Sequence, residues 1–137
     1  LPYFNTFGGN PVAMAAAEAV LKVIEEEHIQ QHAKEVGAEL LKALKEVQAR
    51  HADCVGDVRG AGLFLGFELV SDIEKKTPDQ KKALDLIELL RDNQVLTSCC
   101  GPFGNVLKIR PTLAFASHDI DWVASALDKC LTQLENA

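Results

Sequence analysis

The chain has 137 residues, 47% hydrophobic and 25% charged, so it is long enough for one domain with its own core and too short for a second. Its 20 acidic and 14 basic side chains leave a net charge of -6, which argues against a nucleic-acid-binding surface because phosphate backbones select clustered lysine and arginine. We find no apolar run near the roughly 18 to 20 residues of a membrane span and no leader peptide. We therefore expect a cytoplasmic protein with no membrane or nucleic-acid partner.

The stretch F-N-T-F-G-G-N-P at residues 4–11 predicts a turn that leads into a helix. Gly8 and Gly9 permit positive φ, Asn10 suits the N-cap, and Pro11 suits the first helical position. Free backbone amides and the hydroxyl of Thr6 make the turn suitable for a phosphate or carboxylate. A simple helix entry explains the same residues, and from composition alone the helix entry is favoured.

Two helices follow. Residues 11–27 are apolar on so many faces that we expect most of the first helix to be covered. Residues 29–51 carry apolar side chains at steps of three or four and predict an amphipathic surface helix. We interpret His28, His32 and His51 as solvated or capping side chains, because no cysteine or carboxylate stands at a chelating step from them.

The alternation over residues 63–69 predicts a strand, with the odd-numbered leucines and Phe67 on one face and Phe64, Gly66 and Glu68 on the other. The glycines that begin at R-G-A-G, residues 59–62, do not fit a dinucleotide-binding loop. After Gly60 and Gly62, the third glycine, Gly66, comes one residue too late for G-x-G-x-x-G, and the segment leads into a strand. We expect a bend or bulge there, approached by another backbone or a ligand. For Arg59, an ion pair is favoured over a substrate contact.

The remainder predicts a polar loop at 71–77, a helix opened by Pro78 and ending near residue 92, a strand at 95–99, a turn at 101–105, an antiparallel strand at 106–110 and a last helix capped by Ser117. The predicted fold class is α+β: a small three-stranded, mostly antiparallel sheet covered on one side by about four helices. The four cysteines form no CxxC pair, and we interpret them as free thiols that bind no metal. They are Cys54, Cys99, Cys100 and Cys130.

Three motifs in order resemble one family. They are T-F-G-G-N-P followed by V-A-M-A-A-A-E-A-V-L, V-G-D-V-R-G-A-G-L-F-L-G-F-E-L-V at residues 55–70, and G-N-V-L-K-I-R-P-T-L at residues 104–113. Together they resemble the C-terminal small domain of class III (subgroup II) pyridoxal-phosphate-dependent aminotransferases, which have fold type I. The resemblance implies that residues 1–10 form a phosphate-binding turn at the junction to a missing large domain and that residues 11–137 form the small domain of a homodimeric enzyme.

The same resemblance implies roles in binding pyridoxal 5'-phosphate. Thr6, with Asn5 beside it, matches the family position that hydrogen-bonds the phosphate of the cofactor held by the neighbouring subunit. The Schiff-base lysine lies in the large domain of the family, upstream of this chain. We therefore expect the chain alone to be inactive and the parent enzyme to transfer an amino group between an amine or amino acid and an oxo acid.

The strand end at Lys108 and Arg110 carries the predicted substrate contacts. Many members of the family place an arginine here that binds the substrate carboxylate, and alignment on P-T-L puts Lys108 at that position, with Arg110 two residues on. Lysine does not make the bidentate contact of arginine. V-L-K-I-R-P is similar to the branch of phospho-lyases that act on phosphoethanolamine and phosphohydroxylysine, so β-elimination from an amino phosphate ester is an alternative to transamination. A solvated strand-end lysine explains Lys108 equally well.

A hypothesis of a different kind is a stand-alone, non-catalytic module. The broad apolar surface of the first helix favours it, because an exposed surface of that size binds a partner. The length of the upstream reading frame in the source gene distinguishes the two hypotheses.

Overall fold

The computed structural model describes residues 2–136, which fall into two compact units divided between His32 and Ala33. The first unit contains α1 (Pro11–Glu26). As predicted, Asn10 is its N-cap: the Asn10 side chain accepts a hydrogen bond of 3.0 Å from the Ala13 amide, and Pro11 occupies the first turn. No residue of α1 is buried, although its sequence predicts a covered helix.

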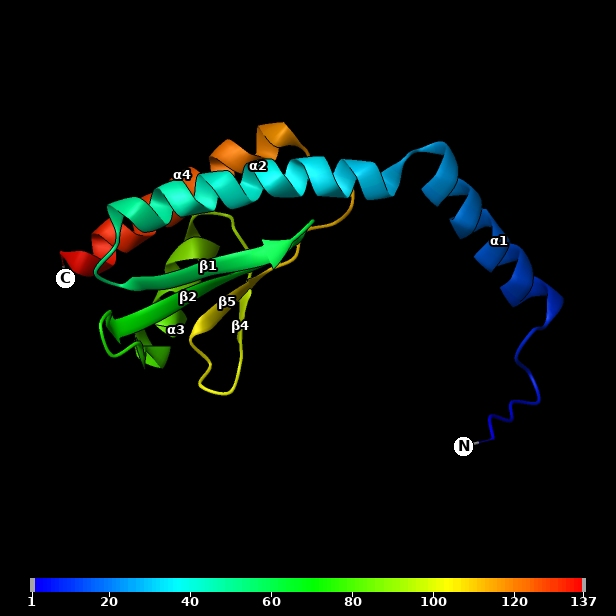
Figure 1. Ribbon diagram of the computed structural model, residues 1–137, viewed down its shortest axis with the longest axis horizontal. Coiled ribbons are helices and arrows are strands. Elements are labelled where there is room, and N and C mark those ends of the chain that lie inside the picture. Colours follow the sequence, from blue (N-terminus) through cyan, green and yellow to red (C-terminus); the bar gives the residue numbers. More distant parts are fainter. Residues whose placement is uncertain (1, 137) are drawn as a thin grey trace. The chain divides into compact units, whose positions relative to one another are not determined.

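The second unit is an α+β layer, which confirms the predicted fold class (Figure 1). Its helices are most of α2 (Ile29–Arg50), α3 (Gln80–Asp92) and α4 (Ser117–Glu135). Its strands are β1 (Val55–Ala61), β2 (Phe64–Asp72), β3 (Thr77–Pro78), β4 (Ser98–Cys100) and β5 (Val106–Ile109). The sheet order is β1-β2-β5-β4, β3 pairs with β2, and every pairing is antiparallel.

The sheet has five strands, so the predicted number of three is wrong. β1 was missed because Gly56, Asp57 and Gly60 weaken its strand pattern; it forms because a two-residue connection lets it pair with β2 as a hairpin. Gly62 takes the first position of that connection with φ of 54°, which a primed hairpin turn requires.

Four predicted boundaries also shift. Pro78 belongs to β3, and Asp79 caps α3 by accepting a 2.9 Å hydrogen bond from the Lys82 amide. Ser117 is the first residue of α4 and does not cap it; instead, the Ala116 amide donates to the Asp119 carboxylate at 2.9 Å. β4 begins at residue 98, three residues later than predicted, and β5 ends at Ile109.

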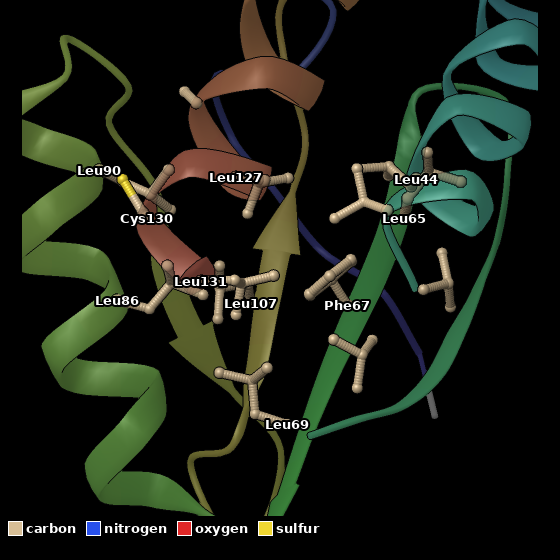
Figure 2. Close-up of a cluster of buried hydrophobic side chains, with 14 of the residues drawn as sticks. Leu44, Leu65, Phe67, Leu69, Leu86, Leu90, Leu107, Leu127, Cys130 and Leu131 are labelled. Atoms are coloured by element: carbon tan, nitrogen blue, oxygen red, sulfur yellow. The ribbon is translucent and has the colours of Figure 1, made fainter. Parts of the chain in front are cut away.

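The core of the second unit lies between the helices and one face of the sheet (Figure 2). Leu65, Phe67 and Leu69 from β2 are at most 2% exposed, as the alternation predicts. They pack with Leu107 of β5 and with leucines from all three helices. On the opposite face of the sheet, Phe64 is exposed and Gly66 and Glu68 are half-buried. One face of the sheet is therefore open to a ligand or to another part of a protein.

Candidate functional site

The opening turn is built by Asn5. Its side-chain oxygen accepts hydrogen bonds of 3.0 Å from the amides of Phe7 and Gly8, and its side-chain nitrogen donates to the Tyr3 hydroxyl at 3.0 Å. Asn5 thus holds the turn in shape. Thr6 is exposed, and its hydroxyl has no hydrogen-bond partner among the described residues. Thr6 is the side chain of the turn that remains available to a ligand.

The predicted substrate residue Lys108 lies on the open face of the sheet. β1 pairs Arg59 with Gly66, β5 pairs Lys108 with Gly66, and β4 pairs Ser98 with Lys108. Directly opposed residues of antiparallel strands project from the same face. Arg59, Gly66, Lys108 and Ser98 therefore form one row across the four strands, and we call it the Gly66 row.

Arg59, at one end of this row, is neutralised by carboxylates. Its guanidinium donates to Asp57 at 2.8 Å and also pairs closely with Glu68. The hydrogen bonds that the guanidinium donates to Asp57 and then to Glu68 raise the pKa of Arg59 above its ordinary value. The predicted ion pair of Arg59 is confirmed.

Lys108 lines a hollow of about 470 Å³ over the Gly66 row. Its ammonium group forms no ion pair with any residue between 2 and 136, in contrast to the guanidinium of Arg59. The walls of the hollow are mainly apolar or small. They include Ala61, Phe64, Cys100 and Val106. A free cation in such surroundings is suited to bind an anionic group.

Arg110 lies past the end of β5 and not within it. Its guanidinium carbon is 5.8 Å from the centre of the Phe64 ring, within the range of a cation–π contact. Arg110 lines a different pocket, of about 370 Å³, together with Trp122 and Asp119. Of the two predicted substrate residues, Lys108 therefore lies within β5 and Arg110 directly after it, and each lines a different one of these two pockets.

The structure reveals a polar cluster that the sequence analysis missed, and the interpretation of His51 as solvated or capping is wrong. His51 is only 5% exposed. Its Nδ1 atom lies 2.9 Å from Glu135 Oε1 and its Nε2 atom lies 3.1 Å from Asp128 Oδ1, so it links the end of α2 to α4. The signal was present, because His51 continues the apolar steps of α2 four residues after the buried Val47.

Titratable neighbours complete this cluster. The hydrogen bond from Arg50, with a smaller one from His51, lowers the pKa of Asp128. Burial acts to raise the pKa of Glu135, but hydrogen bonds from His51 and Cys54 bring it below its ordinary value. Burial raises the pKa of Cys54 to about 11, so this thiol stays protonated at neutral pH. The cluster joins two helices and is stabilised at neutral pH.

The Gly66 row was not predicted from the sequence either. Gly66 and Ser98 become neighbours of Lys108 only through strand pairing, and no local pattern gives the register of β4 and β5 against β2.

The four cysteines are free, as predicted: Cys54 and Cys130 are buried, Cys99 is half-buried and Cys100 is exposed. Among residues 2–136, no helix is both long and apolar enough to cross a membrane.

This α+β domain is similar to part of known transaminases: an aminotransferase of Bacillus anthracis superposes with a TM-score of 0.86 at 33% identity, over 97% of this chain and 30% of that one. The family model for class III aminotransferases matches residues 3–131. The chain belongs to the class III aminotransferase family.

Known relatives include both kinds of enzyme. Ethanolamine-phosphate phospho-lyase homolog 1 of Caenorhabditis elegans is 45% identical over 95% of this chain and 28% of that protein. Alanine–glyoxylate aminotransferase 2 homolog 2 of Arabidopsis thaliana is 43% identical over 96% of this chain and 28% of that protein. Among solved structures, a phospholyase from Arthrobacter in complex with phosphoethanolamine superposes with a TM-score of 0.86 at 38% identity, over 95% of this chain and 31% of that one.

The chain spans less than a third of the length of these relatives. Class III aminotransferases and the phospho-lyases that resemble them depend on pyridoxal phosphate. The residues of the opening turn fit the phosphate of this cofactor in one respect: the Thr6 hydroxyl is an exposed donor without a partner among the described residues.

Proposed function

We propose that this chain is the C-terminal small domain of a longer pyridoxal-phosphate-dependent enzyme that transfers an amino group between an amine or amino acid and an oxo acid. The observation that carries the proposal is the free Lys108 on the open sheet face of a domain that belongs to the class III aminotransferases. The chain spans less than a third of the length of these relatives, so the rest of the active site would come from the remainder of the enzyme. The isolated chain should be inactive.

Thr6 would hold the cofactor. Its hydroxyl would donate a hydrogen bond to the cofactor phosphate, while Asn5 keeps the turn folded through the Phe7 and Gly8 amides. When bound, pyridoxal phosphate supplies an electron sink for bonds broken at the substrate carbon next to the amine. We propose that this turn serves the active site of the second subunit of a homodimer, as the resemblance of T-F-G-G-N-P to the family motif implies.

Lys108 would bind and orient the substrate. Its ammonium group would attract the anionic group of the substrate into the hollow, and Arg110, near the same strand end, would add positive charge. Orientation of this kind places the reacting bonds for catalysis without chemistry at the lysine itself. Lys108 is therefore proposed as a binding residue.

A second function is favoured by the identity of residue 108. Arginine binds carboxylates and phosphates in a bidentate way, whereas lysine loses the bidentate contact with a carboxylate but remains a common ligand of phosphate, which it binds as a point charge. With Lys108 at the family's arginine position, the alternative is a phospho-lyase that eliminates the phosphate from an amino phosphate ester, the phosphate leaving with the electrons of its C–O bond. The identity to the phospho-lyase homolog of Caenorhabditis elegans, 45%, is compatible with this alternative.

The test uses the full-length enzyme loaded with pyridoxal phosphate. Amino transfer from alanine to glyoxylate and phosphate release from phosphoethanolamine are measured side by side. We expect Lys108→Gln to raise KM about 10- to 100-fold, the effect of losing a charge-assisted hydrogen bond. Lys42→Gln, on an exposed position of α2, is the matched control and should leave KM unchanged. Full activity of Lys108→Gln on both substrates, or full activity of the isolated 137-residue chain, would refute the proposal.

A further inference from the structure

The opening turn and the start of α1 carry no charged side chain. Residues 2–17 contain no lysine, arginine, histidine, aspartate or glutamate. A phosphate held by this part of the chain would therefore be bound by neutral hydrogen-bond donors, with support from the positive end of the α1 dipole. Hydrogen bonds to a charged group contribute more than those between neutral groups, so each available donor has a measurable effect on affinity.

Two backbone donors of the turn are already in use. The amides of Phe7 and Gly8 both donate to the side-chain oxygen of Asn5 at 3.0 Å, and these bonds fold the turn. They are therefore not available to a ligand, although the sequence predicts free backbone amides here. Side-chain hydroxyls are the remaining strong donors, and the first unit has two of them, on Tyr3 and Thr6.

The hydroxyl of Tyr3, directly before the turn, is oriented by Asn5. Because the Asn5 oxygen accepts from two amides, its side-chain nitrogen faces Tyr3 and donates to the phenolic oxygen at 3.0 Å. An amide nitrogen can only donate, so Tyr3 is the acceptor in this bond and keeps its own hydrogen for another partner. Tyr3 donates to no acceptor among residues 2–136. The chain thus orients a donor that the described residues do not use.

Packing does not explain this tyrosine. Its side chain is 86% exposed, so it contributes little to any core of the first unit. Its hydrogen bond with Asn5 is exposed as well, and a bond of that kind adds little to stability. The bond does have a chemical effect, because a hydroxyl that accepts a hydrogen bond is polarised and becomes a better donor. Tyr3 is therefore suited to bind an anion that lies beside the turn.

We propose that the Tyr3 hydroxyl donates a hydrogen bond to the cofactor phosphate in addition to the one from Thr6, and that Asn5 orients Tyr3 for this contact. The proposal rests on the proposed function and extends it from one hydroxyl donor to two. Tyr3 is a binding residue and takes no part in the chemistry at the substrate carbon. The group that it recognises is a phosphate monoester, so pyridoxal, which lacks the phosphate, would gain nothing from Tyr3.

The test uses the full-length enzyme freed of its cofactor. Equilibrium dialysis gives the dissociation constants of pyridoxal phosphate and of pyridoxal, and their ratio reports the contribution of the phosphate. We expect Tyr3→Phe to lower the preference for pyridoxal phosphate about 10- to 100-fold and to leave the binding of pyridoxal unchanged. Phe103→Leu, at an exposed aromatic residue of the second unit, is the control and should leave the ratio unchanged. An unchanged ratio in Tyr3→Phe would overturn the proposal.

A second background distinguishes a direct contact from an effect that passes through Thr6. Thr6→Val removes the other hydroxyl and keeps the size of the side chain. If Tyr3 contacts the phosphate itself, Tyr3→Phe should lower the ratio by a similar factor in the Thr6→Val enzyme. If Tyr3→Phe has no further effect there, Tyr3 acts only by positioning Thr6, and the proposal is wrong.

The same ratios separate this proposal from the proposed function. A ratio that falls in Thr6→Val and not in Tyr3→Phe would overturn the role of Tyr3 and leave that of Thr6 intact. A ratio that falls in Tyr3→Phe and not in Thr6→Val would support Tyr3 and refute the role proposed for Thr6. Unchanged ratios in both variants would refute phosphate binding by the opening turn and both roles with it.

Discussion

Replacing Gly37 by alanine should destabilise the second unit even though alanine is the better helix former. Gly37 lies in the middle of α2, and a Cβ atom there would lie 2.2 Å from the carbonyl oxygen of Gly62, 2.3 Å from its carbonyl carbon and 2.6 Å from its Cα atom. Normal non-bonded contacts begin near 3.5 Å, so α2 and the tip of the β1–β2 hairpin would have to separate by about 1 Å. Both sides of this contact are backbone and have no rotamer to change.

The magnitude follows from two opposing effects. Overpacking of this kind costs about 1 to 3 kcal/mol. The gain in helix propensity from glycine to alanine is about 0.5 to 1 kcal/mol. We expect a net loss of about 1 to 2 kcal/mol in the free energy of unfolding, since separation of the hairpin also loosens its contacts with the core.

Equilibrium unfolding in urea measures this loss directly. Ala38→Gly is the matched control, because residue 38 is exposed on the same helix and reports the propensity effect alone, with an expected loss of about 1 kcal/mol. If Gly37→Ala instead gains as much stability as Ala38→Gly loses, the close contact between Gly37 and Gly62 does not constrain the fold, and the reasoning is refuted.

Two further predictions concern stability. The pKa values of Asp128 and Glu135 are lowered in the folded chain, so their ionised carboxylates stabilise the fold. This stabilisation is fully present at a pH above the ordinary pKa values of 3.8 and 4.5, and it is lost as the pH falls through the lower pKa values of the folded chain. The urea midpoint of the original chain should therefore fall as the pH is lowered. In His51→Asn it should fall less steeply with pH, and equal slopes for the two proteins would contradict the prediction. Phe67→Ala should cost about 3 to 5 kcal/mol because Phe67 is fully buried, whereas Phe103→Ala, at an exposed turn, should cost little by the same assay.

The parts of the fold that follow from local pattern were predictable from the sequence. The alternation over residues 63–69 gave β2 because one face must be buried, and Asn10 with Pro11 gave the start of α1 because capping is a local interaction. β1 was not predictable in this way, since its residues favour strand conformation weakly and its pairing with β2 supplies the stability. His51 was misinterpreted because its partners, Asp128 and Glu135, lie more than 70 residues away.

The candidate site divides along the same line. A motif placed Lys108, and the structure puts its side chain on the open sheet face. Its surroundings come from residues that only the sheet brings together: Gly66 lies 42 positions earlier in the chain and Ser98 belongs to the next strand. That Arg59 is neutralised also depends on Glu68 across the hairpin. The residue type at each position can be read from the sequence alone. Which of the charged side chains are neutralised by a partner depends on the register of the paired strands.

The core and the candidate site are fixed by the same strand register. Leu107 is 0% exposed and packs in the core, so Lys108, the next residue, must lie on the opposite face. A slip of β5 by one residue against β2 would place the Lys108 ammonium in the core and Leu107 on the open face, at the cost of burying an unpaired charge. The position of Lys108 therefore cannot drift without loss of the fold. Substitutions at the other residues that line the hollow should therefore change its shape while the strand and Lys108 stay in place.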